Sequence, residues 1–350
     1  MASKVLLFMF WLTAPIIGFM LAFYQTDHPF FPAEPAGLYL PVEHLTEGVQ
    51  HVEEKIKQTQ DLIVKIQLGA ESEKKDVEQQ NQQLAQLLEN SQTQLKKSED
   101  VLDQILSNML GKPIGQTFGK RATIKVFSLE EAGYKGYMAK VKLHDPQALK
   151  MILAQDAVMS KGETTSQAAR RKQAILGINA GGFRTDAQGQ LVPLGITVVD
   201  GQIRTFSNST SLSFVGFNQQ GRLVGGNIAT PEQLQQVGIL QGASFLPTLL
   251  QGGQKLPIPA EWAKKKHPRT LIGHFSNGDL LFIVIDGRRK GWSEGVTLEE
   301  AQEKLLDFKV RDAYNLDGGG SSVFYYNGKV LNRPSDGKER PVSTNIVILP

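Results

Sequence analysis

The stretch YNLDGGGSSV at residues 314–323 sets one carboxylate, Asp317, between a short apolar segment and three successive glycines, with two serines behind them. The apolar residues ahead of Asp317 predict a strand that ends at the acid. Glycine has no Cβ, so it lets a ligand approach the main chain and lets neighbouring N–H groups point into one concavity that favours anions. The stretch therefore predicts either a binding loop for a phosphate or a sugar face, or a sharp turn that binds nothing.

Three other stretches repeat this arrangement. They are GINAGGF at residues 177–183, HPRTLIG at 267–273 and IDGRRKGWSEG at 285–295. Each sets a polar residue next to a glycine at the end of an apolar run, where binding residues on loops are commonly found. Four such stretches in one part of the chain predict loops that converge on one site.

The surrounding segments alternate between strand patterns and turn signals. Asp200-Gly201 and Asn327-Gly328 lie between apolar runs, and such pairs favour tight antiparallel hairpins because they accept positive φ. The predicted strands are 175–178, 194–199, 202–206, 213–217, 280–285, 323–326 and 329–331. Helices are expected at 166–174 and, behind the capping box Thr297-Leu-Glu-Glu300, up to about residue 308. The region from about 115 to 350 is thus an α+β domain with a mixed, largely antiparallel sheet and a few helices.

NLDGGGSS, followed by NRPSDGKERPVSTNIVI at residues 332–348, resembles the signature of the phosphodiester glycosidase domain. This domain occurs in the uncovering enzyme, N-acetylglucosamine-1-phosphodiester α-N-acetylglucosaminidase, and in bacterial proteins associated with exopolysaccharide biosynthesis. Upstream, GETTSQAARRKQAILGINAGGF at 162–183 resembles the family segment that ends in an Asn-Gly-Gly-Phe type of motif, here with Ala180 inserted. PRTLIG, the IDGR stretch and the TLEEAQEKL helix follow in the family order. The resemblance covers about residues 160–350 and implies cleavage of the bond between a sugar and the phosphate on its anomeric oxygen.

Such a reaction, as the resemblance implies it, calls for carboxylates and phosphate-binding cations. Asp317 and Asp286, each at the end of an apolar run, are the candidate catalytic carboxylates. Their distance in space does not follow from the sequence, so retention and inversion of the anomeric configuration both stay open. Arg269, Arg288 and Arg340 are candidate phosphate clamps, because a guanidinium presents a planar fork that matches phosphate oxygens. A phosphate is already a good leaving group, so such contacts can partly replace an acid.

A second set of residues is expected to contact the sugar. Asn179, Ser321 and Ser322 are candidates for hydrogen bonds to hydroxyl or acetamido groups, or they cap turns. The glycines beside them would admit the substrate to the main chain: Gly181, Gly182, Gly318, Gly319 and Gly320.

Other chemistry is less well supported by the sequence. His267 and His274 flank Arg269 and are further acid or base candidates. Ser321 is not a convincing nucleophile, because the chain has no Gly-x-Ser-x-Gly elbow. A divalent cation held by Asp286 and Asp317 is conceivable, but no ligand-spacing motif supports one, so the metal stays unassigned. No cofactor is expected.

The composition excludes several classes of function. The 350 residues are 41% hydrophobic and 21% charged, as in ordinary globular proteins. The net charge is only +3 and the lysines are scattered, so no nucleic-acid partner is expected. Cysteine is absent, which excludes a disulfide framework, a thiolate metal site and a cysteine nucleophile.

The N-terminal segment predicts a membrane anchor. Residues 5–24 form an uncharged apolar run that is long enough to cross roughly 30 Å of hydrocarbon. Lys4 precedes this run and the next basic residue is Lys55, so the positive-inside bias places the N-terminus in the cytoplasm and the rest outside. A cleaved signal peptide is the alternative, but no small-x-small cleavage site is found. We expect a single-pass protein of the cell membrane, with an anchor at 1–26 and a proline-rich spacer at 27–41.

Residues 42–111 predict a stalk. Gln, Glu, Lys and Leu dominate this segment, and apolar or small residues recur at alternating steps of four and three over 52–77 and again over 84–109. This spacing predicts a coiled coil, about 100 Å long if fully helical, that would join copies of the chain into a homo-oligomer. Polar seam residues such as Glu73 and a register slip near Leu87 leave a single solvated helix or a helical hairpin open.

Taken together, these features predict an extracytoplasmic, membrane-anchored glycosidase domain at 112–350. It would hydrolyse the sugar–phosphate bond of sugar-1-phosphodiesters, such as those of N-acetylglucosamine, in cell-surface glycans or exopolysaccharide. The alternative is a non-catalytic protein that binds polysaccharide or acts as a scaffold in envelope glycan biosynthesis. The two are separated by whether both carboxylates face one site with basic groups between them. A third possibility, a glycosidase without phosphate recognition, would tolerate the loss of Arg269 or Arg340.

Overall fold

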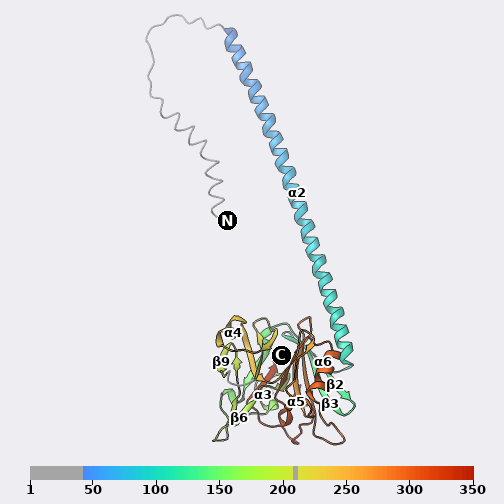
Figure 1. Cartoon of the computed structure of the whole chain (residues 1–350). Coiled ribbons are helices and arrows are strands. Elements are labelled where there is room, and N and C mark those ends of the chain that lie inside the picture. Colours follow the sequence, from blue (N-terminus) through green and yellow to red (C-terminus); the bar gives the residue numbers. More distant parts are fainter. Residues whose placement is uncertain (1–41, 208–211) are drawn as a thin grey trace, which may run out of the picture. The chain divides into compact units, whose positions relative to one another are not determined.

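The computed structural model describes residues 42–207 and 212–350 (Figure 1). The predicted anchor at 1–26 and the predicted spacer at 27–41 lie outside the described residues. Among the helices within the described ranges, none combines the length and the apolar character that crossing a bilayer requires.

Helix α2 (Val42–Leu110) is one continuous helix over the predicted stalk. It ends where Gly111 adopts a φ of 98° and β1 begins at Pro113. The chain divides into one compact unit up to Leu88 and a second from Glu89 onward. In the first unit the apolar residues of the predicted seam are exposed, for example Ile56 at 52% and Ile66 at 62%. The helix is therefore confirmed, whereas its pairing in a coiled coil stays a prediction.

The second unit is built mainly of strands. Their bounds are β1 (Pro113–Phe118), β2 (Ala122–Glu131), β3 (Tyr134–Leu143), β4 (Leu149–Leu153), β5 (Leu176–Asn179), β6 (Phe183–Thr185), β7 (Leu191–Pro193), β8 (Thr197–Val199), β9 (Gln202–Thr205), β10 (Ser213–Asn218), β11 (Leu223–Gly226), β12 (Ile239–Phe245), β13 (Thr248–Gln251), β14 (Gln254–Lys255), β15 (Arg269–His274), β16 (Leu280–Ile285), β17 (Asp312–Leu316), β18 (Phe324–Tyr326), β19 (Lys329–Val330) and β20 (Thr344–Ile348). The helices are α3 (Thr165–Arg171), α4 (Pro231–Gln236), α5 (Ala260–Ala263) and α6 (Leu298–Asp307), with short 3-10 turns η1 (Pro146–Ala148), η2 (Ala154–Asp156) and η3 (Gly319–Ser321).

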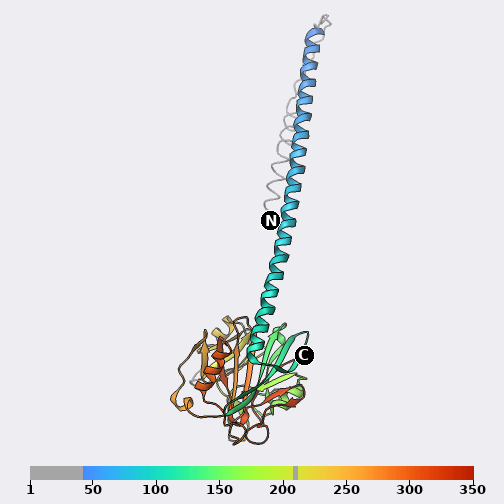
Figure 2. The same cartoon turned by 90° about the vertical axis from the view of Figure 1, so that its right-hand side faces the viewer.

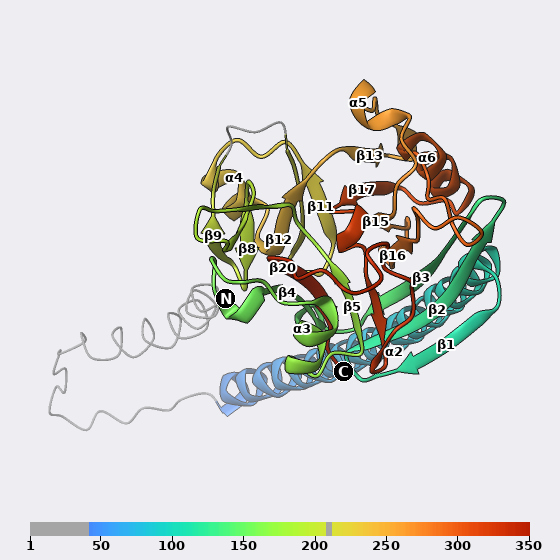
Figure 3. The same cartoon turned by 90° about the horizontal axis from the view of Figure 1, so that it is seen from below.

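The strands form three main sheets and one short hairpin. The largest sheet has the order β1-β2-β3-β16-β15-β17-β13-β14, the second β11-β10-β12-β8-β9 and the third β19-β18-β5-β20-β4. Strands β6 and β7 pair separately. The described strand pairs are antiparallel, and helix α3 lies beside β5 of the third sheet (Figure 3). This architecture confirms the predicted α+β class.

The largest sheet is buried on both faces, which explains the continuous apolar run of β16. Leu280, Phe282 and Val284 point into a core shared with the other two main sheets. Leu281 and Ile283 point the other way, toward a second core that helix α6 covers. A strand that is buried on both faces needs apolar residues at every position, so LLFIVI lacks the usual alternation.

The last turns of α2 are part of this second core. Leu106 and Leu110 are buried against residues of the largest sheet such as Phe127. Figure 2 shows this end of the helix against the green strands β1–β3. The apolar residues of 89–110 thus belong with the folded unit, whereas the sequence analysis assigned them to the stalk.

Buried charges reinforce this junction. Lys140 of β3 is 2% exposed and pairs with both Asp103 of α2 and Asp279. Lys125 of β2 donates a 2.6 Å hydrogen bond to the same Asp103. Removing one partner of a buried ion pair leaves an uncompensated charge, so α2 is held to the sheet by contacts that are costly to break.

Candidate active site

Three strands of the largest sheet bring the predicted loops to one edge. Strands β16 and β17 end at Ile285 and Leu316, directly before Asp286 and Asp317. The antiparallel strand between them, β15, begins at Arg269, which lies opposite Ile285 in the register. The predicted convergence of the HPRTLIG, IDGR and LDGGG stretches is therefore found.

Asn179 at the end of β5 ties the third sheet to this edge. Its side-chain N–H donates a 2.5 Å hydrogen bond to the carbonyl of Asp317, and its Oδ1 accepts from the Thr270 hydroxyl (2.7 Å) and the Val323 N–H (3.2 Å). Asn179 has no exposed surface. The prediction that it hydrogen-bonds the sugar is therefore corrected: Asn179 is a positioning residue that holds the loop of Asp317.

Asp317 itself is partly exposed. Its N–H donates to the carbonyl of Ala180 (2.9 Å), which fixes the main chain on the side of β5. Burial raises the pKa of its carboxyl to about 6, although the nearby Ser321 hydroxyl, the Arg340 cation and the Gly318 N–H each oppose this shift. An acid with a pKa near neutrality exchanges protons readily at neutral pH, which is the property required of a general acid or base.

The three glycines leave room for neighbouring groups to lie against the loop. A Cβ on Gly318 would be 2.8 Å from the carbonyl oxygen of Pro268, and one on Gly320 would be 2.2 Å from Arg340 Nη2. Gly319 has a φ of +63°, and a Cβ there would meet the Arg288 guanidinium at 3.3 Å. The N–H of Gly319 is already bonded to Pro268. The glycines thus bring two guanidinium groups against the main chain beside Asp317.

Arg288 is exposed and has a left-handed backbone, with a φ of 57°. Its Nη2 donates to Nδ1 of His267 at 3.1 Å. A guanidinium only donates, so this Nδ1 is unprotonated and the neutral ring carries its proton on Nε2. Burial and the cations Arg269, Arg288 and Lys265 lower the pKa of His267, which keeps the ring neutral. The pair presents N–H donors without an acidic partner.

Arg340 approaches the loop together with Asp336. Its Nη2 donates a 2.7 Å hydrogen bond to Asp336, and both side chains are partly exposed. This bond lowers the pKa of Asp336, whereas the pKa of Asp317 is raised. Two carboxyls whose pKa values diverge beside one loop are candidates for separate proton-transfer roles. Asp336 was not among the residues predicted from the sequence, where its one signal is an acid four residues ahead of Arg340.

Arg269 is 2% exposed, so it has little surface for direct phosphate contact. Its guanidinium donates to the carbonyls of Val296 (3.3 Å) and Lys265 (3.0 Å). It has no carboxylate partner among the described residues, and burial, helped by Arg288, lowers its pKa to about 10. We therefore correct its role from a clamp to a buried positive charge behind the loop.

Asp286 is 1% exposed and its carboxylate is fully occupied. It accepts hydrogen bonds from Trp292 Nε1 (2.9 Å), Asn332 Nδ2 (3.1 Å) and the N–H of Arg333 (2.9 Å). Burial raises its pKa, and these donors oppose the rise. The prediction that Asp286 is a catalytic carboxylate is therefore corrected: it joins the 286–295 loop to the 332–333 segment.

The remaining predicted contacts differ in their placement. Gly181 and Gly182 are buried against β12, and their N–H groups donate to Thr344 of β20 and Ser244 of β12, so their predicted substrate contact is corrected to packing. The hydroxyls of Ser321 and Ser322 are buried and have no hydrogen-bond partner within the described part of the chain. Both residues are only 1% exposed, so the structure gives their hydroxyls no surface for the predicted sugar contacts.

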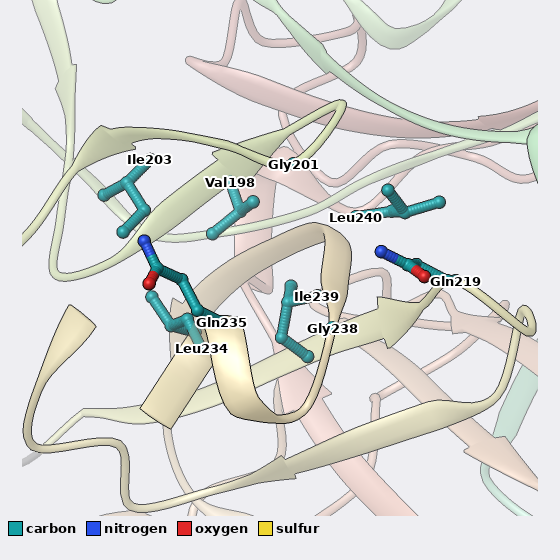
Figure 4. Close-up of a pocket in the computed structure, with 9 residues that line it drawn as sticks. All are labelled: Val198, Gly201, Ile203, Gln219, Leu234, Gln235, Gly238, Ile239 and Leu240. Atoms are coloured by element: carbon teal, nitrogen blue, oxygen red, sulfur yellow. The ribbon is translucent and has the colours of Figure 1, made fainter. Parts of the chain in front are cut away.

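Two further features lie apart from this site. His274 bonds to Asp312 (2.6 Å) at the far end of β15, so it does not join Arg269. A pocket of about 430 Å³ between the β8–β9 hairpin and α4 is shown in Figure 4. Its lining residues are Val198, Gly201, Ile203, Gln219, Leu234, Gln235, Gly238, Ile239 and Leu240. It contains no ionisable side chain, so it offers no acid, base or cation.

No cluster of three or more His, Asp or Glu side chains suited to a metal ion occurs in residues 42–207 and 212–350.

Comparison with known proteins matches this part of the chain to one family. The family model described as "Phosphodiester glycosidase" matches residues 172–349, which include every residue discussed around Asp317. The SPbeta prophage-derived uncharacterized protein YomE of Bacillus subtilis (strain 168) is 30% identical over 198 residues, covering 53% of this chain and 29% of that protein. N-acetylglucosamine-1-phosphodiester alpha-N-acetylglucosaminidase of Homo sapiens is 30% identical over 189 residues, covering 49% of this chain and 36% of the human protein. The chain thus spans about a third of the length of these curated relatives.

Solved structures share the fold. The catalytic domain of the zebrafish N-acetylglucosamine-1-phosphodiester alpha-N-acetylglucosaminidase superimposes with a TM-score of 0.56 at 22% identity, covering 67% of this chain and 85% of that domain. A hypothetical protein from Synechocystis gives a TM-score of 0.54 at 16% identity, covering 68% of this chain and 64% of that one. At these identities the likeness concerns the fold.

Proposed function

The chain belongs to the phosphodiester glycosidase family, and from this membership we propose that it hydrolyses the bond between a sugar and phosphate in sugar-1-phosphodiesters. One observation carries the proposal. Asp317, partly exposed and with a pKa of about 6, lies on a triple-glycine loop against which the Arg288 and Arg340 guanidiniums are placed.

The guanidiniums would bind the phosphate. Arg288 and the Nε2–H of His267 present donors with no acidic partner, and Arg340 can exchange Asp336 for a phosphate oxygen. The buried charge of Arg269 makes the loop more positive from behind. Guanidinium groups fit phosphate oxygens in a fork and neutralise the charge that grows on the leaving group.

Asp317 would act as the general base. Water attacks the anomeric carbon while the bond from that carbon to the bridging oxygen breaks through an oxocarbenium-like transition state. The electron pair of the broken bond stays on the oxygen, which leaves as a phosphate monoester, and the proton of the water goes to Asp317. One accessible carboxylate is sufficient for this scheme, because the leaving group needs little help from an acid. Asp336, whose pKa Arg340 lowers, is ionised and holds that guanidinium, so it can accept a proton but has none to deliver to the phosphate.

The test compares Asp317→Asn with Asp307→Asn, a control on an exposed acid of α6. Methyl N-acetylglucosamine-1-phosphodiester is incubated with each protein, and release of the phosphate monoester is followed by phosphorus NMR. Loss of a general base lowers the rate by about 100-fold to 10,000-fold, so we expect that loss in the Asp317 variant and none in the control. Equal product from both proteins would remove Asp317 from the mechanism.

The burial of Asp286 leaves one accessible predicted carboxylate and so favours one alternative, a protein that binds polysaccharide without cleaving it. In that case the unaltered chain would bind the phosphodiester and release no product in the same assay. Binding that depends on Arg288 and Arg340 would then locate the same site for a non-catalytic role.

The cellular setting also belongs to this proposal. The apolar run at residues 5–24 supports a membrane anchor with the glycosidase unit outside the cell, and the seam of α2 supports a coiled-coil stalk joining copies of the chain. The substrate would then be a cell-surface glycan or exopolysaccharide. Carbonate extraction of membranes tests the anchor, and light scattering of the purified chain tests the oligomer.

A further inference from the structure

Cations without acidic partners gather on the three loops that border Asp317. The exposed ones lie in the segments 264–265, 288–290 and 333–338, whereas Arg269 beside them is buried. None forms an ion pair with a side chain that the structure describes, whereas the neighbouring Lys266 pairs with Glu294. These exposed, unpaired cations are Lys264, Lys265, Arg288, Lys290, Arg333 and Lys338.

The three loops are bonded to one another. The carbonyl of Lys265 accepts from Arg269, and His267 of the same loop accepts from Arg288. Arg289, the neighbour of Arg288, donates from Nη2 to the carbonyl of Pro334 at 3.0 Å. The loops therefore form one continuous border around the Asp317 loop, and the cations they carry share one surface.

This concentration of charge is a local property. The whole chain has a net charge of only +3, and several basic side chains elsewhere in the described residues, such as Lys140, Lys150 and Arg171, have acidic partners, whereas unpaired ones such as Lys120 and Lys309 lie outside the three loops. One cation of the border is also held in place: the guanidinium of Arg333 stacks at 3.6 Å on the ring of Trp292. Stacking fixes the plane of the guanidinium and leaves its N–H edge free for an anion.

We propose that these side chains form a cation track that binds further phosphates of the substrate on either side of the one being cleaved. The substrate is then a polyanionic glycan with a phosphodiester at successive repeats, because a single phosphodiester would occupy Arg288 and Arg340 and leave the outer cations unused. This inference rests on the proposed function, whose site it extends. It assigns the outer residues Lys264, Lys265 and Lys338 to binding rather than to catalysis.

The test measures binding by full-length Asp317→Asn protein, which does not consume the ligand. The probes are poly(N-acetylglucosamine 1-phosphate) and its methyl phosphodiester monomer. The track variant is Lys264→Gln/Lys265→Gln/Lys338→Gln, and the matched control is Lys120→Gln/Lys309→Gln/Lys329→Gln, which removes the same charge from exposed lysines outside the three loops. Circular dichroism verifies that both variants fold.

We expect the polymer to bind more tightly than the monomer, and the track variant to lower the ratio of polymer to monomer affinity by about tenfold while the control variant does not change it. Counterion release predicts that polymer affinity also falls by about tenfold between 50 and 200 mM salt. Three results would overturn the cation track. They are equal affinity for polymer and monomer, an equal loss of polymer affinity in the track and control variants, and equally tight binding of duplex DNA of the same charge.

Turnover of the monomer by the unaltered chain separates this inference from the proposed function. A chain that cleaves the monomer but shows no preference for the polymer keeps the proposed function and loses the track. A chain that cleaves neither ligand loses the proposed function, whatever the binding ratio.

Discussion

Asn179 ends β5 and Asp317 directly follows β17, a strand of a different sheet, and the side-chain N–H of Asn179 donates a 2.5 Å hydrogen bond to the main-chain carbonyl of Asp317. The same asparagine holds Thr270 at the start of β15 through its Oδ1. One fully buried side chain thus fixes the acid relative to both sheets, and the geometry of the site depends on a residue that no substrate reaches.

Asn179→Ala should therefore lower both stability and turnover. It removes the partners of the Asp317 carbonyl, the Thr270 hydroxyl and the Val323 N–H, and each buried group left unsatisfied costs about 1–3 kcal/mol. Urea unfolding and kcat at saturating substrate measure the two effects. Asn227→Ala, at an exposed position, serves as the control. An Asn179→Ala variant with unaltered stability would show that the hydrogen bonds of Asn179 are not needed to hold the two sheets together.

The rate of hydrolysis should rise with pH through the pKa of Asp317. A general base acts in its ionised form, so kcat/KM is low below a pKa of about 6 and reaches a plateau above it. The measurement is kcat/KM against pH over about two units on either side. A profile that falls through this range would instead assign Asp317 the role of an acid.

Asp317→Asn should make the protein more stable at neutral pH while it inactivates it. The pKa of Asp317 is raised from 3.8 to about 6, so its stabilising effect is complete below the unfolded pKa and is lost as pH rises through the folded pKa. A pKa shift of about two units corresponds to at most about 3 kcal/mol of folding free energy that the ionised carboxylate costs at neutral pH. The uncharged amide of the variant would recover part of this free energy. Thermal unfolding of both proteins below pH 3.8 and above a pH of about 6 tests this expectation. A loss of stability at neutral pH would contradict it.

Gly320→Ala should impair binding of the phosphate group without a large loss of stability. The new Cβ would lie 2.2 Å from Arg340 Nη2, and a guanidinium at the end of a flexible side chain can move away. Because Arg340 lowers the pKa of Asp317, its displacement should also move the pH profile upward. Gly318→Ala is the contrasting variant, since its Cβ would meet the main-chain carbonyl of Pro268 at 2.8 Å and destabilise the fold. Unchanged KM and pH profile in Gly320→Ala would exclude Arg340 from the site.

Asp286→Asn should act on folding rather than on chemistry. Its carboxylate accepts three N–H donors, and an amide cannot accept from all of them, so the variant should lose about 1–3 kcal/mol. The folded fraction should keep the pH profile of the unaltered chain. A fully stable variant that has lost more than about 100-fold in kcat would return Asp286 to the catalytic residues.

The positions of strand ends followed from the sequence because apolar runs stop where a sheet stops. Strand β16 occupies the predicted residues 280–285, and α6 begins behind the predicted cap at Thr297, whose side chain accepts from the Glu300 N–H. The antiparallel order β16-β15-β17, which the sequence did not predict, then places the start of β15 beside the ends of β16 and β17 and brings Arg269, Asp286 and Asp317 to one edge.

The exposure of these side chains could not be predicted in the same way. Asp286 is covered by Trp292 and Asn332, which lie on two different loops, so its burial depends on contacts that no local pattern encodes. Asp336 lies in a polar loop with Pro334 and Gly337, where an acid carries no signal of its own. The proposed site keeps Asp317 from the prediction and takes in Asp336 in place of the buried Asp286, whereas the buried Asn179 and Arg269 lie behind its surface.

The ion pairs of Lys140 also have a consequence for how the chain is made. Asp103 and Lys140 leave the ribosome early, whereas Asp279 follows 139 residues after Lys140, which takes about 7 to 28 s of translation. During that time the nascent chain carries Leu106 and Leu110 without strand β16, whose Leu281 and Ile283 belong to the same core in the folded unit. The unit from Glu89 onward therefore completes its fold late in synthesis, and a product released by premature termination before β16 should be a target for proteolysis.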